Sequence, residues 1–246
     1  MRPLLEICVG DIGSIRAAAE GGADRIELCS ALTEGGLTPS CGQLRAALEG
    51  PVPVNVLIRP RRGDFLYSTD EVAVMCRDIE EVVRLGANGV VIGALTAEGD
   101  IDLRALDAMR RAAAGAHVTF HRAFDLCRDP ETALAQIIEA GCDTLLTSGL
   151  KPDALSGAAE IRRLKELAQG RIAIMAGCGV TPANAAEIIA TAAPDALHGT
   201  ASMTVDSPMR FRREEVGMGA PQDEYRRKTT SVETVMQLRQ VIDTTI

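Results

Sequence analysis

The chain has 246 residues with 26 basic and 34 acidic side chains, and its formal net charge is −8. Hydrophobic residues make up 46% and charged residues 24%, which is the balance of a folded protein rather than of a disordered one. The acidic charge argues against a nucleic-acid-binding protein, which needs clustered lysine and arginine. No apolar run approaches the roughly 20 residues of a membrane span, and Asp11 comes too early for a signal peptide. We therefore expect a soluble, cytoplasmic protein.

Short β-branched or apolar runs alternate with helical patterns along the whole chain. The predicted strands are 4–9, 25–29, 54–59, 89–93, 117–122, 144–148, 172–176 and 196–199. Apolar residues recur at helical spacing between the strands, for example within 72–83 and 161–168. Because aromatic residues make up only 2% of the chain and tryptophan is absent, the core that these elements enclose is expected to be aliphatic.

Three loops carry the same signal for the end of a helix. They read Gly22-Ala23-Asp24, Gly86-Ala87-Asn88 and Gly141-Cys142-Asp143. Glycine tolerates the left-handed conformation that often follows the last turn of a helix. Each loop is therefore predicted to connect a helix to the next strand.

Eight strands in strict alternation with helices predict a (β/α)₈ barrel, the TIM barrel, rather than an open doubly wound sheet. No linker or low-complexity stretch interrupts the pattern, so we expect a single domain over residues 1–246. A final helix around 231–243 would close the outer ring. The segment of about 200–230 is predicted to be a long, irregular loop after the last strand.

In a barrel, alternate residues of a strand face the helices and the interior. The apolar row of Leu5, Ile7 and Val9 predicts that Glu6 and Cys8 point inward. The same reasoning gives a set of inward residues near the carboxyl ends of strands, where barrel enzymes carry their sites. They are Glu6, Cys8, Glu27, Cys29, Arg59 and His121. Glu6, Glu27, Arg59 and His121 are expected around one cavity mouth, and Cys8 and Cys29 inside the barrel.

Buried carboxylates need partners, and Arg59, Arg25 and His121 are the candidates. A structural ion-pair layer is one interpretation, and an acid–base set with perturbed pKa values is the other. The position at strand ends favours the acid–base set, with His121 facing the acidic pair and Asp125 orienting its ring. His198 is predicted to be a capping or core histidine.

Glycine-rich turns follow the seventh and eighth predicted strands, where barrels often bind phosphate. Gly177, Gly179, Gly199 and Thr200 are the candidate anion-binding residues, because glycine lets backbone N–H groups approach an anion closely. Glycines that merely relieve crowding are an equally good interpretation. Both remain open at the level of sequence.

Seven cysteines, an odd number without a Cys-x-x-Cys pair, predict reduced thiols in a chain without a secretory signal. Two of them, Cys8 and Cys29, point inward from adjacent strands, and a pair of soft thiolates suits Cu(I). Buried cysteine is also a common, inert core residue, which the residues alone favour. We expect both to react slowly with a bulky thiol reagent, whereas Cys41, near a helix start, should be accessible.

The chain resembles the CutC copper homeostasis protein family. The matching blocks run in order from residue 4 to about 212 and include LLEICV, GADRIELC, EGGLTPS, IRPRRGDFLYS, GVVIGAL, FHRAFD, LLTSG, IMAGCGV, HGTA and SPMRFR. The resemblance implies a (β/α)₈ barrel, a cytoplasmic location and copper bound by Cys8 and Cys29. It also implies a site made of Glu6, Glu27, Arg59, His121, Arg122 and Asp125. Cys178 stands where the family usually has a glycine.

Two hypotheses follow for the function. The first is a copper homeostasis protein that binds copper as Cu(I). The alternative is a barrel enzyme that acts on a small phosphorylated or otherwise anionic metabolite by acid–base chemistry of the lyase or isomerase type. A third, non-catalytic hypothesis is a homo-oligomer that acts as the functional unit. The expected partner is thus a copper ion or a small anion, and neither nucleic acid nor a membrane.

Overall fold

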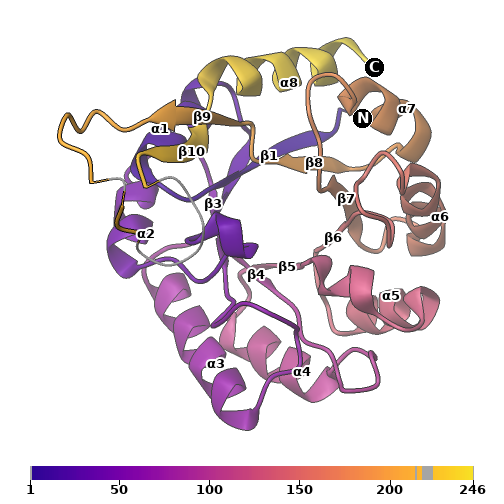
Figure 1. The fold of residues 1–246 in the computed structure, drawn as a ribbon. Helices are drawn as coiled ribbons and strands as arrows, with labels where there is room; N and C mark the ends of the chain where they lie inside the picture. The colour runs from indigo at the N-terminus through magenta and orange to yellow at the C-terminus, as the bar shows by residue number, and fades with distance from the viewer. Residues whose placement is uncertain (1, 214, 218–223, 246) are drawn as a thin grey trace.

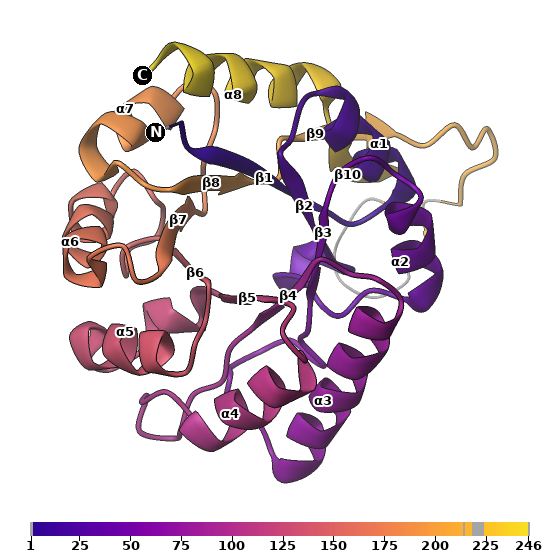
Figure 2. The same ribbon diagram turned by 180° about the vertical axis from the view of Figure 1, so that it is seen from behind.

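A closed barrel of eight parallel strands lies at the centre of the computed structural model, which describes residues 2–213, 215–217 and 224–245. Helices surround the barrel on its outside, as both end-on views show (Figures 1 and 2). This architecture confirms the predicted (β/α)₈ fold. Among the described residues, no helix has the length and apolar character needed to span a bilayer.

The elements follow the predicted order with small shifts at their ends. The barrel strands are β1 (Leu4–Val9), β2 (Arg25–Leu28), β3 (Val54–Leu57), β4 (Gly89–Ile92), β5 (His117–Phe120), β6 (Thr144–Thr147), β7 (Ala173–Gly177) and β8 (Ala196–Gly199). The α-helices are α1 (Ile12–Glu20), α2 (Cys41–Leu48), α3 (Thr69–Arg84), α4 (Leu103–Ala112), α5 (Pro130–Glu139), α6 (Ala158–Ala168), α7 (Ala185–Ala192) and α8 (Val232–Thr244). Two 3₁₀ turns, η1 (Leu32–Glu34) and η2 (Arg122–Leu126), follow β2 and β5.

Local signals in the sequence set the ends of these helices. Ser68 begins α3 with a reciprocal capping box, in which its side chain accepts from the Glu71 N–H and the Glu71 carboxylate accepts from the Ser68 N–H. At the other ends, Gly22, Gly86 and Gly141 have φ values of 87°, 104° and 76°. These left-handed conformations confirm the three predicted helix–strand loops.

The register of the barrel brings a polar row to its interior. Glu6 of β1 is level with Arg25 of β2 on one side and with His198 of β8 on the other. The β1–β8 pairing closes the barrel, so it joins residues from the two ends of the chain. Three ionisable side chains therefore meet in one layer.

The hydrophobic residues divide as the alternation of the strands predicts. Leu5, Ile7 and Val9 pack into the main core between barrel and helices. A separate small cluster inside the barrel consists of Cys8, Cys29, Leu57 and Val91, and another consists of Leu146, Met175 and Ala196. The barrel interior therefore combines two small apolar clusters with the polar row.

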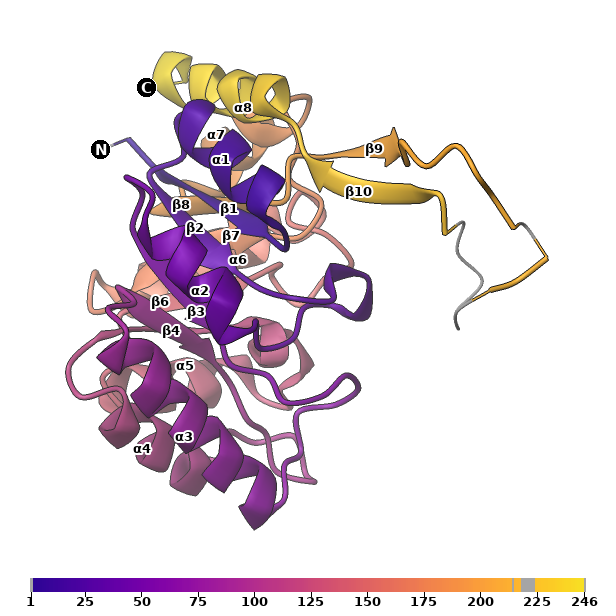
Figure 3. The same cartoon turned by 90° about the vertical axis from the view of Figure 1, so that its left-hand side faces the viewer.

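The loop after β8 differs from its prediction. Within it, β9 (Ser202–Asp206) and β10 (Arg226–Thr230) pair as an antiparallel ribbon that extends away from the barrel (Figure 3). The prediction of irregular structure was wrong for these two strands. Most of their residues are exposed, so they lack the alternating apolar pattern by which a half-buried strand is recognised. The base of the ribbon is fixed to α1, where the Thr230 N–H donates to Ser14 Oγ at 3.0 Å.

Candidate functional site

A cavity of about 730 Å³ opens at the carboxyl ends of the barrel strands. It is lined by ten of the twelve residues that the sequence singled out: Cys8, Glu27, Cys29, Arg59, His121, Arg122, Asp125, Gly179, Gly199 and Thr200. The other two, Glu6 and Gly177, are not in its lining. The structure therefore gathers most of the predicted site around one space.

Glu6 lies beneath the cavity rather than at its mouth, which corrects the prediction. Its side chain has no solvent exposure. One carboxylate oxygen accepts from Arg25 Nε and from Asn55 Nδ2, and the other accepts from His198 Nδ1 at 2.8 Å. Burial alone would raise the pKa of Glu6, but His198 and Arg25 hold it at about 2. Glu6 is thus a fixed anion in an ion-pair layer. This layer lies two residues before Cys8 along β1, below the residues that line the cavity.

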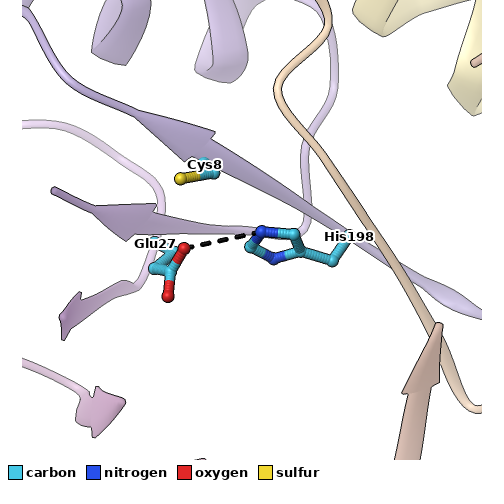
Figure 4. A group of neighbouring side chains, drawn as sticks. All are labelled: Cys8, Glu27 and His198. Carbon is cyan, nitrogen blue, oxygen red and sulfur yellow. Dashed lines mark ion pairs between the residues drawn. The ribbon is translucent and has the colours of Figure 1, made fainter. Parts of the chain in front are cut away.

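His198 joins this layer to the cavity. While Nδ1 donates to Glu6, Nε2 lies 3.5 Å from a carboxyl oxygen of Glu27. The ligating atoms of Cys8, Glu27 and His198 lie within 4.8 Å of one another (Figure 4). Burial would lower the pKa of His198, but Glu27, Cys8 and Glu6 outweigh it and hold the pKa well above its ordinary value.

Sequence reasoning gave His198 too little importance. A single histidine before a glycine carries no spacing signal of its own. The alternation of β8 does carry one, because Leu197 packs into the outer core and the following residue must therefore point inward. The same argument that selected Glu6 would have selected His198.

The two inward thiols are in contact. The Cys8 and Cys29 sulfurs lie 3.4 Å apart, and both residues are buried. A hydrogen bond from Cys29 lowers the pKa of Cys8 to about 5, against the effect of burial and with help from His198. Burial and the Cys8 charge raise the pKa of Cys29 well above its ordinary value. The two thiols of the pair therefore have pKa values shifted in opposite directions.

All seven cysteines are free thiols. Cys41, the first residue of α2, is exposed, whereas Cys8 and Cys29 are buried. The expected difference in accessibility is therefore present in the structure.

Glu27 is the carboxyl group that faces the cavity. Its side chain is 6% exposed, and burial together with the charge on Cys8 raises its pKa well above the ordinary value. Glu6 and Glu27, equivalent in the sequence pattern, thus have pKa values shifted in opposite directions. Of these two carboxyl groups, Glu27 lines the cavity and Glu6 does not.

His121 directly follows β5 and lines the same cavity, but its ring does not have the partner that was predicted. Its Nδ1 accepts a hydrogen bond from the Ala123 N–H at 3.1 Å, and its ring centroid lies 4.8 Å from that of Phe65. Burial, reinforced by Arg59, lowers the pKa of His121 to about 3, so the ring is neutral. The prediction that Asp125 orients this ring is wrong.

The 3₁₀ turn η2 directs Asp125 towards β6 instead. Its carboxylate accepts from Arg122 Nε at 2.8 Å, from the Thr147 hydroxyl, and from both the N–H and the hydroxyl of Ser148. Arg122 also donates to Ser148 Oγ at 2.9 Å. The Arg122–Asp125 pair is thereby fixed at the cavity rim.

Arg59 also departs from its predicted role as a partner of the buried carboxylates. Its Nη1 donates to the carbonyls of Glu34 and Gly36, and its Nη2 donates to the carbonyl of Gly63. These bonds draw the guanidinium towards the loops after β2 and β3. It therefore holds those loops together rather than neutralising Glu6 or Glu27.

The two glycine-rich turns reach the cavity in part. Gly177 sits within β7, where an added Cβ would lie 2.5 Å from Leu146 Cδ1, so it relieves crowding. No helix starts directly after either turn, since α7 begins at Ala185 and β8 is followed by β9. Cys178 has φ of 80°, in the region that favours glycine. An anion site at Gly179, Gly199 and Thr200 stays a prediction.

The sequence model of the CutC family matches residues 3–203, which include every residue of the cavity lining named above. The chain belongs to the CutC family. The predicted resemblance is thereby confirmed. CutC family proteins of Chromobacterium violaceum and Bacteroides thetaiotaomicron are 48% and 46% identical to it over 245 and 241 residues. These alignments cover 99% of both chains in the first case, and 96% of this chain and 97% of the relative in the second.

A solved structure of CutC from Streptococcus agalactiae, named as a copper homeostasis protein, superposes with a TM-score of 0.77 at 33% identity. It covers 81% of this chain and 99% of that one. A more distant barrel, thiamine phosphate pyrophosphorylase from Pyrococcus furiosus, reaches a TM-score of 0.59 at 15% identity. That likeness shows the shared fold alone.

Proposed function

We propose that this CutC family protein binds one Cu(I) ion as its cargo, through the thiolates of Cys8 and Cys29 and the imidazole of His198. The observation that carries the proposal is the 3.4 Å contact between the two sulfurs at the cavity floor. Soft thiolates favour Cu(I), and imidazole is also a good copper ligand. The donor set therefore fits the metal after which the family is named.

The surroundings of His198 support its role as the third ligand. Histidines that bind metals usually donate their other ring N–H to a carboxylate, which fixes the ring and raises its basicity. Here the donor is Nδ1 and the acceptor is the buried carboxylate of Glu6, itself held by Arg25. Nε2 is left on the side of Cys8 and Glu27. Binding of the ion would displace the remaining protons from Nε2 and Cys29.

The proposal places the protein in the cytoplasm, where glutathione and thioredoxin keep thiols reduced. Reduced thiols are the form that Cu(I) binding needs. All seven cysteines are free in the structure, and the cavity gives an ion access to the otherwise buried sulfurs.

The test is an anaerobic titration with Cu(I) in competition with a chromophoric Cu(I) chelator. We expect one tightly bound ion per chain, and its loss when Cys8→Ser and Cys29→Ser are combined. Cys41→Ser is the matched control, because this thiol is exposed and belongs to α2. Unchanged stoichiometry in the double variant would refute the proposal.

A further inference from the structure

A second part of the cavity lining carries a positive charge, the guanidinium of Arg59, that no acidic residue among those described pairs with. Arg59 is 7% exposed and uses its two Nη atoms on backbone carbonyls. Within the described ranges, no carboxylate forms an ion pair with its guanidinium, and its Nε, like the hydroxyl of the neighbouring Tyr67, has no hydrogen-bond partner. A buried charge without a counter-ion is costly. As far as the structure describes the chain, the surroundings of the Arg59 guanidinium therefore lack an anion.

The neighbouring acids are already engaged. The Asp125 carboxylate pairs with Arg122 at 2.8 Å. The Glu34 carboxylate pairs with Arg62 at 2.9 Å, and only its backbone carbonyl contacts Arg59. The opposite charges within each of these two ion pairs cancel. Among the described residues, this side of the cavity therefore retains the positive charge of Arg59.

His121 supplies a second free donor beside this charge. Because its Nδ1 accepts from the Ala123 N–H, the proton of the neutral ring is on Nε2. Nε2 is buried and has no hydrogen-bond partner in the described part of the chain. The Phe65 ring contacts both groups, since its centroid lies 5.1 Å from the Arg59 guanidinium carbon and 4.8 Å from the His121 ring centroid. Phe65 therefore packs against both groups that carry these donors.

We propose that the cavity binds a small organic carboxylate, with one oxygen on Nε of Arg59 and the other on Nε2 of His121, once the Phe65 ring moves aside. Two N–H donors match the two oxygens of a carboxylate, and one cation matches its single charge. A phosphate monoester would bring a third oxygen and a second charge without a further free donor. The cavity of about 730 Å³ has the size of a small-molecule site. This site goes beyond the proposed copper binding.

The test is an NMR titration of the ¹⁵N-labelled, copper-free protein with acetate and with succinate. The side-chain N–H resonances of Arg59 Nε and His121 Nε2 report directly on the proposed contacts. We expect saturable shifts of both. Arg59→Lys, which keeps the charge but lacks the Nε donor, and His121→Phe, which keeps a ring against Phe65, should each weaken binding by about 10-fold or more. Phe65→Ala should bind several-fold more tightly.

Arg84→Ala is the control, because Arg84 is an exposed arginine at the end of α3 that pairs with Glu81 outside the cavity lining, and the affinity should be unchanged. Unaltered binding in His121→Phe would overturn the proposal even if Arg59→Lys failed to fold. Equally tight, saturable binding of chloride or inorganic phosphate would overturn the carboxylate assignment. The Cys8→Ser, Cys29→Ser variant should still bind acetate. Its result therefore separates a failure of this site from a failure of copper binding.

Discussion

Two parts of one cavity use their buried polar groups in opposite ways. Around His198, each ionisable group meets another one, and the contacts hold Glu6, Cys8 and His198 in charged forms although they are buried. Around Phe65, Arg59 and His121 each have a buried N–H donor that meets no acceptor within residues 2–213, 215–217 and 224–245. In the first part every ionisable group has a partner, and a metal ion could replace the protons that these groups share. The second part is incomplete, which is the property expected of a ligand site.

The largest effect should come from breaking the complete part at its base. Glu6→Gln removes the anion that holds Arg25 and His198, which leaves the buried Arg25 without its carboxylate and His198 with Glu27 alone. We expect a loss of about 3–5 kcal/mol in the free energy of unfolding, measured by urea denaturation. Glu131→Gln, which breaks the exposed pair with Arg163, should cost less than about 1 kcal/mol. Equal losses in the two variants would show that the buried layer does not act as a unit.

A substitution of His198 should separate copper binding in this part of the cavity from its contribution to the stability of the fold. His198→Asn removes the proposed third ligand but leaves both sulfurs. The affinity for Cu(I), measured by chelator competition, should fall by about 10–100-fold while the stoichiometry stays at one ion. An affinity equal to that of the unaltered protein would leave Cys8 and Cys29 as the only ligands.

The pH dependence of stability distinguishes the second part from the first. His121 has a pKa of about 3 in the folded protein against 6.5 in the unfolded chain. Its contribution is therefore complete above pH 6.5 and is lost as the pH falls towards 3, because only the unfolded chain takes up the proton. This residue alone should contribute a slope of up to about 1.4 kcal/mol per pH unit. The pH–stability curve of His121→Phe should lack that slope, so the difference between the two curves should change with pH between about 3 and 6.5. Parallel curves for the two proteins would mean that His121 has the same pKa in the folded and the unfolded chain.

The smallest effect concerns the turn after β7, which borders both parts. Cys178 adopts a left-handed conformation that costs a non-glycine residue about 1 kcal/mol. Cys178→Gly should raise the free energy of unfolding by about 0.5–1 kcal/mol. The gain is smaller than the full cost of the left-handed conformation because glycine loses more chain entropy on folding. Cys178→Ala, which keeps the Cβ, should bring no gain. A thermal-unfolding series of the three proteins measures the difference.

The sequence predicted the barrel because eight strand–helix units repeat with their own end signals, and strand alternation is a local property. Alternation also selected Glu6, Cys8, Glu27 and Cys29 as inward residues. It could not give their depth, which depends on the register between strands. Glu6 therefore appeared equivalent to Glu27 although it lies one layer lower.

Contacts between β1 and β8, which close the barrel, could not be predicted from patterns in short stretches of sequence. Glu6 and His198 are 192 residues apart in the chain, and only the β1–β8 register brings them together. The orientation of Asp125 depends in the same way on β6, where Ser148 and Thr147 supply hydrogen-bond donors. The acid–base role of Glu27, His121 and their neighbours stays a prediction.

The most direct test of the central claim is X-ray absorption at the copper edge of the protein loaded with one equivalent of Cu(I). This measurement identifies the atoms bound to the metal without reference to affinity. We predict two sulfur ligands and one imidazole nitrogen, with both sulfur contributions lost in the Cys8→Ser, Cys29→Ser variant. A copper site without sulfur, or one whose sulfur ligands persist in that variant, would contradict the account.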